Sequence, residues 1–217
     1  YGRYLDLDDD GIPYRTIPAT HPTEGAFVTR GSSRDEYAVY TEDGDTYRRN
    51  MDRLMRKWNT AKELVPQPVF YLSAHRSADT LVRTDAASVS EKPPSENQAE
   101  KKQSLADKSV RAPSGVIFFG TSTFAAEEAL ELLSEEGIHL DAMRVRAFPF
   151  GKAFCEFVES HDKLFVIEQN RDAQFRSLMM IELRVDASKL VSVLNYDGTP
   201  ISADNIYRQI KTNGTWL

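Results

Sequence analysis

The chain has 217 residues, of which 41% are hydrophobic and 28% are charged, a composition that suits a folded core beneath a polar surface. The net charge of −6 argues against a general nucleic-acid binder, which needs Lys and Arg to neutralise phosphates. No apolar run is long enough to cross a bilayer. Cys155 is the single cysteine, so an internal disulfide is excluded and a reducing, cytoplasmic setting is expected.

Residues 1–45 are rich in turn formers and short of apolar periodicity, so we expect loops that need another surface to pack on. The segment DLDDDG at 6–11 resembles the start of a calcium-binding loop, with oxygen ligands at positions 1, 3 and 5 and a glycine at position 6. The bidentate glutamate of position 12 is replaced by Ile17. The sequence therefore predicts a solvated acidic turn ahead of the proline-containing segment, and no metal site.

A helix is predicted next, because Met51, Leu54, Met55 and Trp58 recur at helical spacing and end near Pro66. The opposite face is rich in arginine, and a solvated face is its ordinary explanation. VFYLS at 69–73 predicts a strand. Residues 76–113 are polar and almost without large apolar groups, so we expect a disordered or loosely attached insert there.

From residue 115 onward, apolar strands alternate with amphipathic helices. The expected strands are GVIFFG, IHLDAMRV, KLFVIE and KLVSVL, and the expected helices lie between them and at about 202–211. One of these helices should stop at Gly137. Such alternation predicts an α/β three-layer sandwich with a largely parallel sheet.

Signatures of common cofactor sites are absent from the sequence. No G-x-G-x-x-G follows a strand, no Walker A segment is present, and the glycine-rich turn of a thiamine-diphosphate magnesium site is missing. The four histidines lack metal-ligand spacing, so no metal site is predicted. Cys155 stands between Phe154 and Phe157 on a predicted helix, which favours a buried structural thiol.

Polar side chains follow two of the predicted strands. Thr121 and Ser122 come directly after the first strand of the sandwich and before a helix, where a ligand anion can meet helix N–H groups. An N-cap is the plainer role for their hydroxyls, and the one we favour. Asn170 and Gln174 follow the KLFVIE strand, a place that suits a ligand or a subunit contact, although a helix cap is also the plainer role for Asn170.

Several longer segments carry a resemblance to one family. GIPYRTIPATHPTEGAFVTRGSSRDEYAVYTEDGDTYRRNMDRLMRKW closely resembles a block of the α subunit of 2-oxoacid:ferredoxin oxidoreductases, most like the 2-oxoglutarate type. GVIFFGTST, GIHLDAMRVRAFPF, VIEQNRDAQFRSL and LNYDGTPIS follow in that subunit's order and spacing. The resemblance covers nearly all of the chain except the insert at 76–113.

The resemblance implies that the chain is the C-terminal part of a larger α subunit. Residues 1–45 would finish the module that binds the pyrimidine half of thiamine diphosphate, and residues 46–217 would form a domain like the C-terminal domain of transketolases. The expected partners are the upstream part of the α subunit, a β subunit that carries thiamine diphosphate, Mg and an iron–sulfur cluster, ferredoxin, a 2-oxoacid and coenzyme A. No nucleic acid or membrane is expected, and the chain alone should be inactive.

The resemblance also implies substrate-binding residues. Arg15 matches an arginine at the substrate end of the family's active site, and Thr20 matches a nearby threonine. A guanidinium group suits the carboxylate of a 2-oxoacid, because it offers two parallel hydrogen bonds. The alternative for Arg15 is a structural pairing with Asp8, Asp9 or Asp10. The family usually has glycine where this chain has Ala19, so alanine would be strained there if the position requires a positive φ.

Two other classes of protein stay open from the sequence. One is the transketolase-type C-terminal domain of another thiamine enzyme, such as a 2-oxoacid dehydrogenase. The other is a non-catalytic subunit-interaction domain, whose acidic turn and polar insert would bind partners. The segment IPYRTIPATHP favours the oxidoreductase over the dehydrogenase.

Overall fold

The computed structural model describes residues 2–25, 33–72, 82–85, 114–214 and 216. The chain divides into two compact units, Tyr1–Val65 and Pro66–Leu217. The sequence predicts a boundary near residue 45, whereas helix α1 (Gly44–Leu64) groups with the N-terminal segment. The helix groups with this segment because its side chains bind the turn at residues 6–11, which lies 42 to 50 residues earlier in the sequence. The functional roles expected for the two domains stay predictions.

Helix α1 begins at a well-formed cap. The Asp43 carboxylate accepts hydrogen bonds at 2.8 Å from both the N–H and the hydroxyl of Thr46. These bonds lower the pKa of Asp43, with the backbone N–H making the largest contribution. A side-chain oxygen that satisfies an orphan N–H of the first turn is the usual way to start a helix. The helix ends at Leu64, just ahead of Pro66, as the sequence predicts.

The faces of α1 are used differently from the sequence-based expectation. Arg53 is buried, with 7% of its surface exposed, whereas Tyr47, Met51, Leu54 and Met55 are exposed. Arg53 packs against the N-terminal segment, so the prediction of a solvated basic face was wrong for this residue, whereas Arg48, Arg49 and Arg56 are exposed. No hydrophobic side chain of the described part of the first unit belongs to a buried core cluster.

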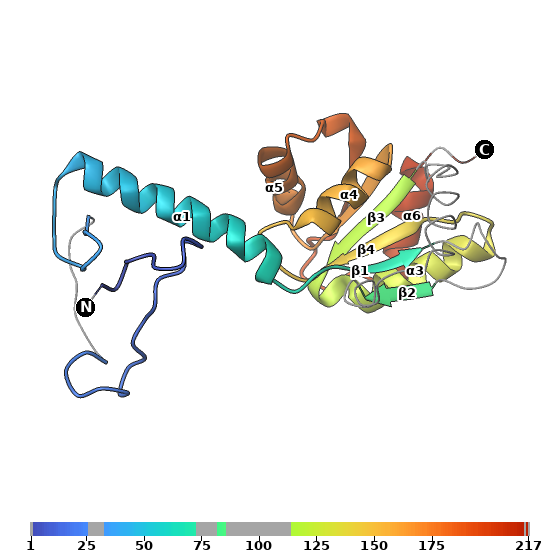
Figure 1. Ribbon diagram of the computed structural model, residues 1–217. Helices are drawn as coiled ribbons and strands as arrows, with labels where there is room; N and C mark the ends of the chain where they lie inside the picture. Colours follow the sequence, from blue (N-terminus) through green and yellow to red (C-terminus); the bar gives the residue numbers. More distant parts are fainter. Residues whose placement is uncertain (1, 26–32, 73–81, 86–113, 215, 217) are drawn as a thin grey trace, which may run out of the picture. The chain divides into compact units, whose positions relative to one another are not determined.

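The second unit contains a six-stranded sheet with the order β2-β1-β4-β3-β5-β6 (Figure 1). The strands are β1 (Val69–Leu72), β2 (Val82–Asp85), β3 (Ser114–Phe119), β4 (Asp141–Val145), β5 (Lys163–Glu168) and β6 (Leu190–Leu194). Strands β4, β3, β5 and β6 are parallel, which confirms the predicted largely parallel sheet. β1 pairs antiparallel with β4, and β2 with β1.

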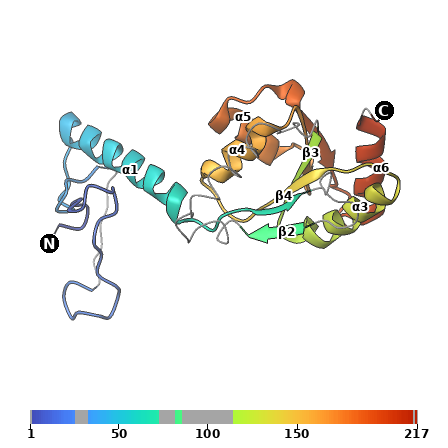
Figure 2. The same ribbon diagram turned by 45° about the vertical axis from the view of Figure 1, so that its right-hand side comes forward.

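Helices cover both faces of this sheet, so the predicted three-layer sandwich is confirmed (Figures 1 and 2). The helices are α3 (Thr123–Glu135), α4 (Lys152–Ser160), α5 (Gln174–Leu183) and α6 (Ala203–Asn213). Side chains of α3 and α6 pack on one face, and those of α4 and α5 pack on the other. α3 ends where Gly137, at φ 80°, lets the Ile138 N–H reach the Leu133 carbonyl at 2.9 Å, as expected for a glycine that stops a helix.

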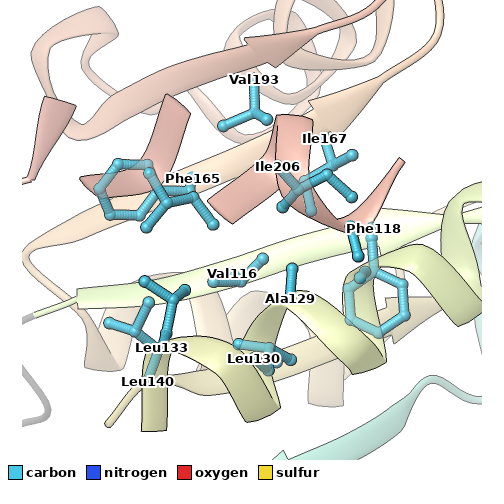
Figure 3. Close-up of a cluster of buried hydrophobic side chains, with 14 of the residues drawn as sticks. Val116, Phe118, Ala129, Leu130, Leu133, Leu140, Phe165, Ile167, Val193 and Ile206 are labelled. Carbon is cyan, nitrogen blue, oxygen red and sulfur yellow. The ribbon is translucent and has the colours of Figure 1, made fainter. Parts of the chain in front are cut away.

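The core explains the continuous apolar strands of the sequence. In β5, Phe165 and Ile167 enter one cluster, while Leu164 and Val166 enter the cluster on the opposite face. Figure 3 shows the first cluster, in which Phe165 and Ile167 meet side chains from β3, β6, α3 and α6. Because successive strand residues point to opposite faces, the central residues of a strand that is buried on both faces form a continuous apolar run.

The predicted insert at 76–113 lies outside the described residues, except for residues 82–85, which form β2. None of the helices in the described ranges combines the length and apolarity needed to cross a bilayer.

Candidate functional site

The acidic turn at residues 6–11 is organised around the Asp6 carboxylate. Its two oxygens accept the Gly11 N–H at 3.0 and 3.1 Å, and Arg56 of α1 pairs with it at 2.9 Å. Only 7% of the Asp6 side chain is exposed. The prediction of a solvated turn was therefore wrong for Asp6, because its carboxylate is a bound structural anion that joins the turn to α1.

Electrostatics of Asp6 agree with this geometry. Burial alone would raise the pKa of its carboxyl group, but hydrogen bonds from Arg56 and Gly11 and the positive charge of Arg56 oppose it. Together they hold the pKa of Asp6 below its ordinary value. The folded chain therefore favours the ionised form.

Two further side chains of α1 bind the same turn through its backbone. Arg53 donates from Nη1 to the Gly11 carbonyl at 3.0 Å, and the Thr60 hydroxyl donates to the Asp10 carbonyl at 2.5 Å. Gly11 has φ 81°, and a Cβ there would lie 2.1 Å from the Lys57 nitrogen. Only glycine fits this conformation and this close approach to α1. The turn is thus fixed at the point from which Ile12-Pro13-Tyr14-Arg15 departs.

A second anchor holds the chain on the other side of Arg15. Arg3, with 9% of its surface exposed, donates from Nη1 to the Thr16 hydroxyl at 2.8 Å and from Nη2 to the Glu24 carbonyl at 2.7 Å. The Thr16 hydroxyl also donates to the Glu24 carbonyl at 2.6 Å. This network closes residues 16–24 into a loop with fixed ends.

Arg15 lies between these anchors, and its side chain is exposed. Within the described part of the chain, no acceptor or carboxylate is bonded to its guanidinium group. The three aspartates that could have paired with Arg15 contact other groups. Asp8 accepts the Tyr14 hydroxyl at 2.6 Å, and Asp10 accepts the Ile12 N–H at 2.7 Å. Asp9 lies 3.4 Å from Arg56. The guanidinium is therefore available to an anion from outside the described residues.

Thr20 lies on the same loop as Arg15 and is also exposed. Its N–H and its hydroxyl both donate to the Ile17 carbonyl, at 3.1 and 2.5 Å. The turn places Ala19 at φ 68°, a left-handed conformation that glycine adopts without strain. The concern about alanine at this position is thus confirmed. No hydrogen bond joins Thr20 to Arg15 in the described structure.

A cavity of about 290 Å³ lies beside these anchors in the first unit. Three arginines of α1, Arg49, Arg53 and Arg56, line it together with three acids, Asp6, Glu36 and Asp52. Arg49 pairs with Glu36 at 3.0 Å, and this hydrogen bond lowers the pKa of Glu36. Because the formal charges of these six residues cancel, the cavity by itself does not indicate an anion site.

The second set of candidates lies at the carboxyl edge of the sheet. Strand β3 continues into the single turn Gly120–Ser122, and the Thr121 hydroxyl accepts the side-chain N–H of Gln169, which follows β5, at 2.8 Å. Gln169 also accepts the Ile201 N–H at 3.1 Å. β3 and β5 are neighbours whose following connections lead to opposite sides of the sheet, the position at which open α/β sheets usually bind ligands. Sequence reasoning identified Thr121 but missed Gln169.

The expected N-cap at Ser122 is not formed. The Ser122 hydroxyl donates to the Phe119 carbonyl at 2.6 Å, and the Thr123 hydroxyl donates to the Gly120 carbonyl at 2.7 Å. Both hydroxyls therefore bond backward to carbonyls and do not accept an N–H of α3. The prediction was wrong because local spacing does not reveal the direction in which a hydroxyl turns.

Asn170 and Gln174 are brought together by the buried Glu168, which has 1% of its surface exposed. The Glu168 carboxylate accepts the Phe175 N–H at 2.6 Å, the Arg176 N–H at 2.9 Å and the Asn170 amide at 2.9 Å. Asn170 accepts the Gln174 N–H at 3.2 Å, and Ala173 rather than Asn170 occupies the N-cap position of α5. These groups satisfy one another at the start of α5.

Metal and cluster ligands do not gather in the described residues, where no group of three or more His, Cys, Asp or Glu side chains could hold a metal ion. Cys155 is half-buried in α4 rather than fully buried as expected. A single cysteine cannot supply the ligands of an iron–sulfur cluster. The described residues therefore do not fit an iron–sulfur cluster or a carboxylate-bound Mg²⁺.

Comparison with known proteins gives one relative in sequence. The chain is 24% identical over 213 residues to the α subunit of 2-oxoacid:ferredoxin oxidoreductase 2 from Aeropyrum pernix, a match over 97% of this chain and 27% of the relative. The chain thus spans about a quarter of the length of that relative. No family model matches the chain.

Comparison with solved structures extends the likeness to the fold. A 2-oxoglutarate:ferredoxin oxidoreductase from Magnetococcus marinus, solved with 2-oxoglutarate, coenzyme A and succinyl-CoA bound, superimposes with a TM-score of 0.65 and 18% identity, over 98% of this chain and 30% of that one. The α chain of a probable 2-oxoacid ferredoxin oxidoreductase from Thermoplasma acidophilum also matches, with 22% identity over 48% of this chain, 90% coverage of that chain and a TM-score of 0.33. The sequence match confirms the resemblance found in the motifs: the chain is similar to the α subunit of 2-oxoacid:ferredoxin oxidoreductases.

Proposed function

We propose that the chain is the C-terminal part of the α subunit of a 2-oxoglutarate:ferredoxin oxidoreductase. The assembled enzyme would convert a 2-oxoacid and coenzyme A to acyl-CoA and carbon dioxide, and would pass the two electrons released to ferredoxin. The sequence relative supports the 2-oxoacid class, and the name of the matched structure favours 2-oxoglutarate.

The wider assembly belongs to the same proposal. Residues 1–45 would complete the module that binds the pyrimidine half of thiamine diphosphate, and the sandwich of the second unit would be the transketolase-like domain. Thiamine diphosphate, Mg and the iron–sulfur cluster would be held mainly by the upstream module and a β subunit, in a cytoplasmic enzyme. When bound, thiamine diphosphate supplies the carbanion chemistry of decarboxylation. This chain would contribute groups that bind and orient the substrate.

The observation that carries the proposal is the presentation of Arg15. Its backbone lies between a turn fixed on α1 and a loop end fixed by Arg3, whereas its guanidinium group has no hydrogen-bonded partner in the described residues. A fixed backbone reduces the conformational freedom that is lost when the guanidinium binds a carboxylate through two hydrogen bonds. Arg15 is therefore proposed to bind the carboxylate of the 2-oxoacid.

Thr20 is proposed as a second group for the same substrate. Its hydroxyl hydrogen is donated to the Ile17 carbonyl, so its oxygen would bind a ligand as an acceptor. The groups at the carboxyl edge of the sheet, Thr121, Ser122, Asn170 and Gln174, remain proposed ligand or subunit contacts. The bond from the Ser122 hydroxyl to the Phe119 carbonyl, and that from the Gln174 N–H to Asn170, make a structural role the simpler one for Ser122 and Asn170.

The test uses the assembled enzyme with Arg15→Lys, which keeps the charge but loses the planar pair of donors. Loss of charge-assisted hydrogen bonds should lower kcat/KM for 2-oxoglutarate roughly ten- to a hundredfold. Arg48→Lys is the control, because Arg48 is exposed on α1 and pairs only with the neighbouring Asp45. If Arg15→Lys has the same kcat/KM as the parent enzyme at limiting 2-oxoglutarate and at limiting coenzyme A, Arg15 does not bind the substrate. A change confined to coenzyme A would reassign the ligand.

The chain by itself is proposed to be inactive, because its residues do not fit the redox centre. The purified, iron-free chain should reduce no dye with 2-oxoglutarate and coenzyme A present, and measurable reduction would contradict the proposal. Copurification distinguishes the remaining classes. An iron–sulfur β subunit as partner supports the oxidoreductase, whereas an iron-free partner supports a dehydrogenase-type or a non-catalytic domain.

A further inference from the structure

Arg53 is a buried, charged side chain that has no role in the proposed chemistry. It lies in the middle of α1 with 7% of its surface exposed. Its Nη1 donates to the Gly11 carbonyl at 3.0 Å, and the Tyr4 ring lies 5.8 Å from its Cζ. Its Nε is buried and has no acceptor among the described residues, and no carboxylate there lies within ion-pair distance.

Electrostatics oppose this arrangement. Burial lowers the pKa of Arg53, the Asp6 carboxylate partly counteracts this, and the positive charge of Arg15 lowers it further. A guanidinium held out of water without a paired carboxylate is costly. Arg53 nevertheless lies where its guanidinium donates a hydrogen bond to the Gly11 carbonyl.

Gly11 is held from both of its polar groups. Its carbonyl accepts from Arg53, and its N–H donates to Asp6, which Arg56 fixes in turn. Four residues later the chain reaches Arg15, and Pro13 stiffens the path between them. Moving Gly11 would therefore move the departure point of the segment that carries Arg15.

We infer that Arg53 is a positioning residue for Arg15: its bond to the Gly11 carbonyl fixes the segment that presents the Arg15 guanidinium to the carboxylate of the substrate. This inference rests on the proposed function of Arg15. Arg53 does not touch the substrate. It fixes the backbone from which the Arg15 side chain extends, so that less conformational freedom is lost when the carboxylate of the substrate binds.

One arm of the test measures the segment directly by amide hydrogen exchange in the assembled enzyme. In Arg53→Gln, peptides covering residues 10–16 should exchange roughly tenfold faster, as expected for the loss of one buried hydrogen bond. Arg53→Lys, which keeps a donor, should restore much of the protection. Arg48→Gln removes the same charge from the exposed side of α1 and should leave the peptides unchanged. Equal exchange in Arg53→Gln and Arg48→Gln would overturn the inference.

The second arm measures coupling between the two arginines. Arg53→Gln should raise KM for 2-oxoglutarate several-fold and change kcat less, but should have no further effect in an Arg15→Met background. A residue that only stabilises the fold would lower Tm in both backgrounds and would change kcat/KM by the same factor in each. Such equal factors would overturn the positioning role.

The two arms also separate this inference from the proposed function. If Arg15→Met leaves kcat/KM unchanged, the assignment of Arg15 to the substrate fails. The exchange arm then still decides whether Arg53 holds the segment. If Arg15→Met lowers kcat/KM but Arg53→Gln changes neither the amide hydrogen exchange of residues 10–16 nor KM, the proposed function is supported and the positioning role of Arg53 is excluded.

Discussion

Asp6 and Arg56 form an ion pair at 2.9 Å, although they are 50 residues apart in the sequence. The Asp6 carboxylate also accepts the Gly11 N–H with both of its oxygens. One carboxylate thus shapes the acidic turn and docks it on α1. The composition of this turn suggests a metal site, but its carboxylate is bound by the Arg56 guanidinium of the same chain.

Asp6→Asn should destabilise the first unit. The amide keeps one acceptor oxygen but loses the charge that faces Arg56, and we expect a loss of about 1–2 kcal/mol in the free energy of unfolding, since Arg56 is 45% exposed and solvent weakens the pair. Urea denaturation followed by Trp58 fluorescence, in a Trp216→Phe background, reports on this unit. Asp52→Asn on the exposed surface of α1 is the control. Equal midpoints for the two variants would show that the carboxylate is not a structural anion.

The same carboxylate should give the first unit an acid-sensitive stability. The pKa of Asp6 is lower in the folded chain than its ordinary value of 3.8, so the stabilisation is complete above that value and is lost as the pH falls through the folded pKa. Urea midpoints measured by Trp58 fluorescence between pH 6 and about pH 2 should therefore fall less steeply for Asp6→Asn than for the parent chain. Parallel curves for the two proteins would contradict this assignment.

Ala19→Gly should relieve backbone strain in the loop that carries Thr20. Ala19 has φ 68°, a conformation that costs a non-glycine residue about 1–2 kcal/mol. Glycine adds freedom to the unfolded chain, which offsets part of the relief, so the expected gain is at most about 1 kcal/mol. Ala61→Gly inside α1 is the matched control and should cost about 1 kcal/mol. If both changes destabilise alike in urea denaturation, the left-handed conformation of Ala19 is not retained in solution.

Glu168→Gln should destabilise the second unit. The buried carboxylate accepts two N–H groups at the start of α5 and the amide of Asn170, and a glutamine amide can replace only one of its oxygens as an acceptor. An unsatisfied buried donor costs about 1–3 kcal/mol, so thermal unfolding should occur several degrees lower. Glu182→Gln, on the exposed side of the same helix, should leave Tm within about one degree. A similar Tm for both variants would show that α5 does not depend on this cap.

The sequence by itself determined the architecture of the second unit. The run KLFVIE is apolar at its four central positions because β5 is buried on both faces, and Gly137 marks the end of α3 because glycine adopts the left-handed conformation that the last turn needs. The polar residues after β3 and β5 could also be found from the sequence, since the carboxyl ends of parallel strands share one edge. The segment around Arg15 was recognisable through its family motif.

Only the tertiary structure decided how α1 is used. Its periodicity separates an apolar face from an arginine face, and local spacing suggests that the apolar face is buried. The structure buries Arg53 instead, because the Gly11 carbonyl, 42 residues away, provides its hydrogen-bond partner. Likewise, Gln169 was overlooked because its partners, Thr121 and Ile201, lie 48 and 32 residues away. The hydrogen-bond partner of a polar side chain can lie far away in the sequence, and helical or strand spacing carries no information about such a partner.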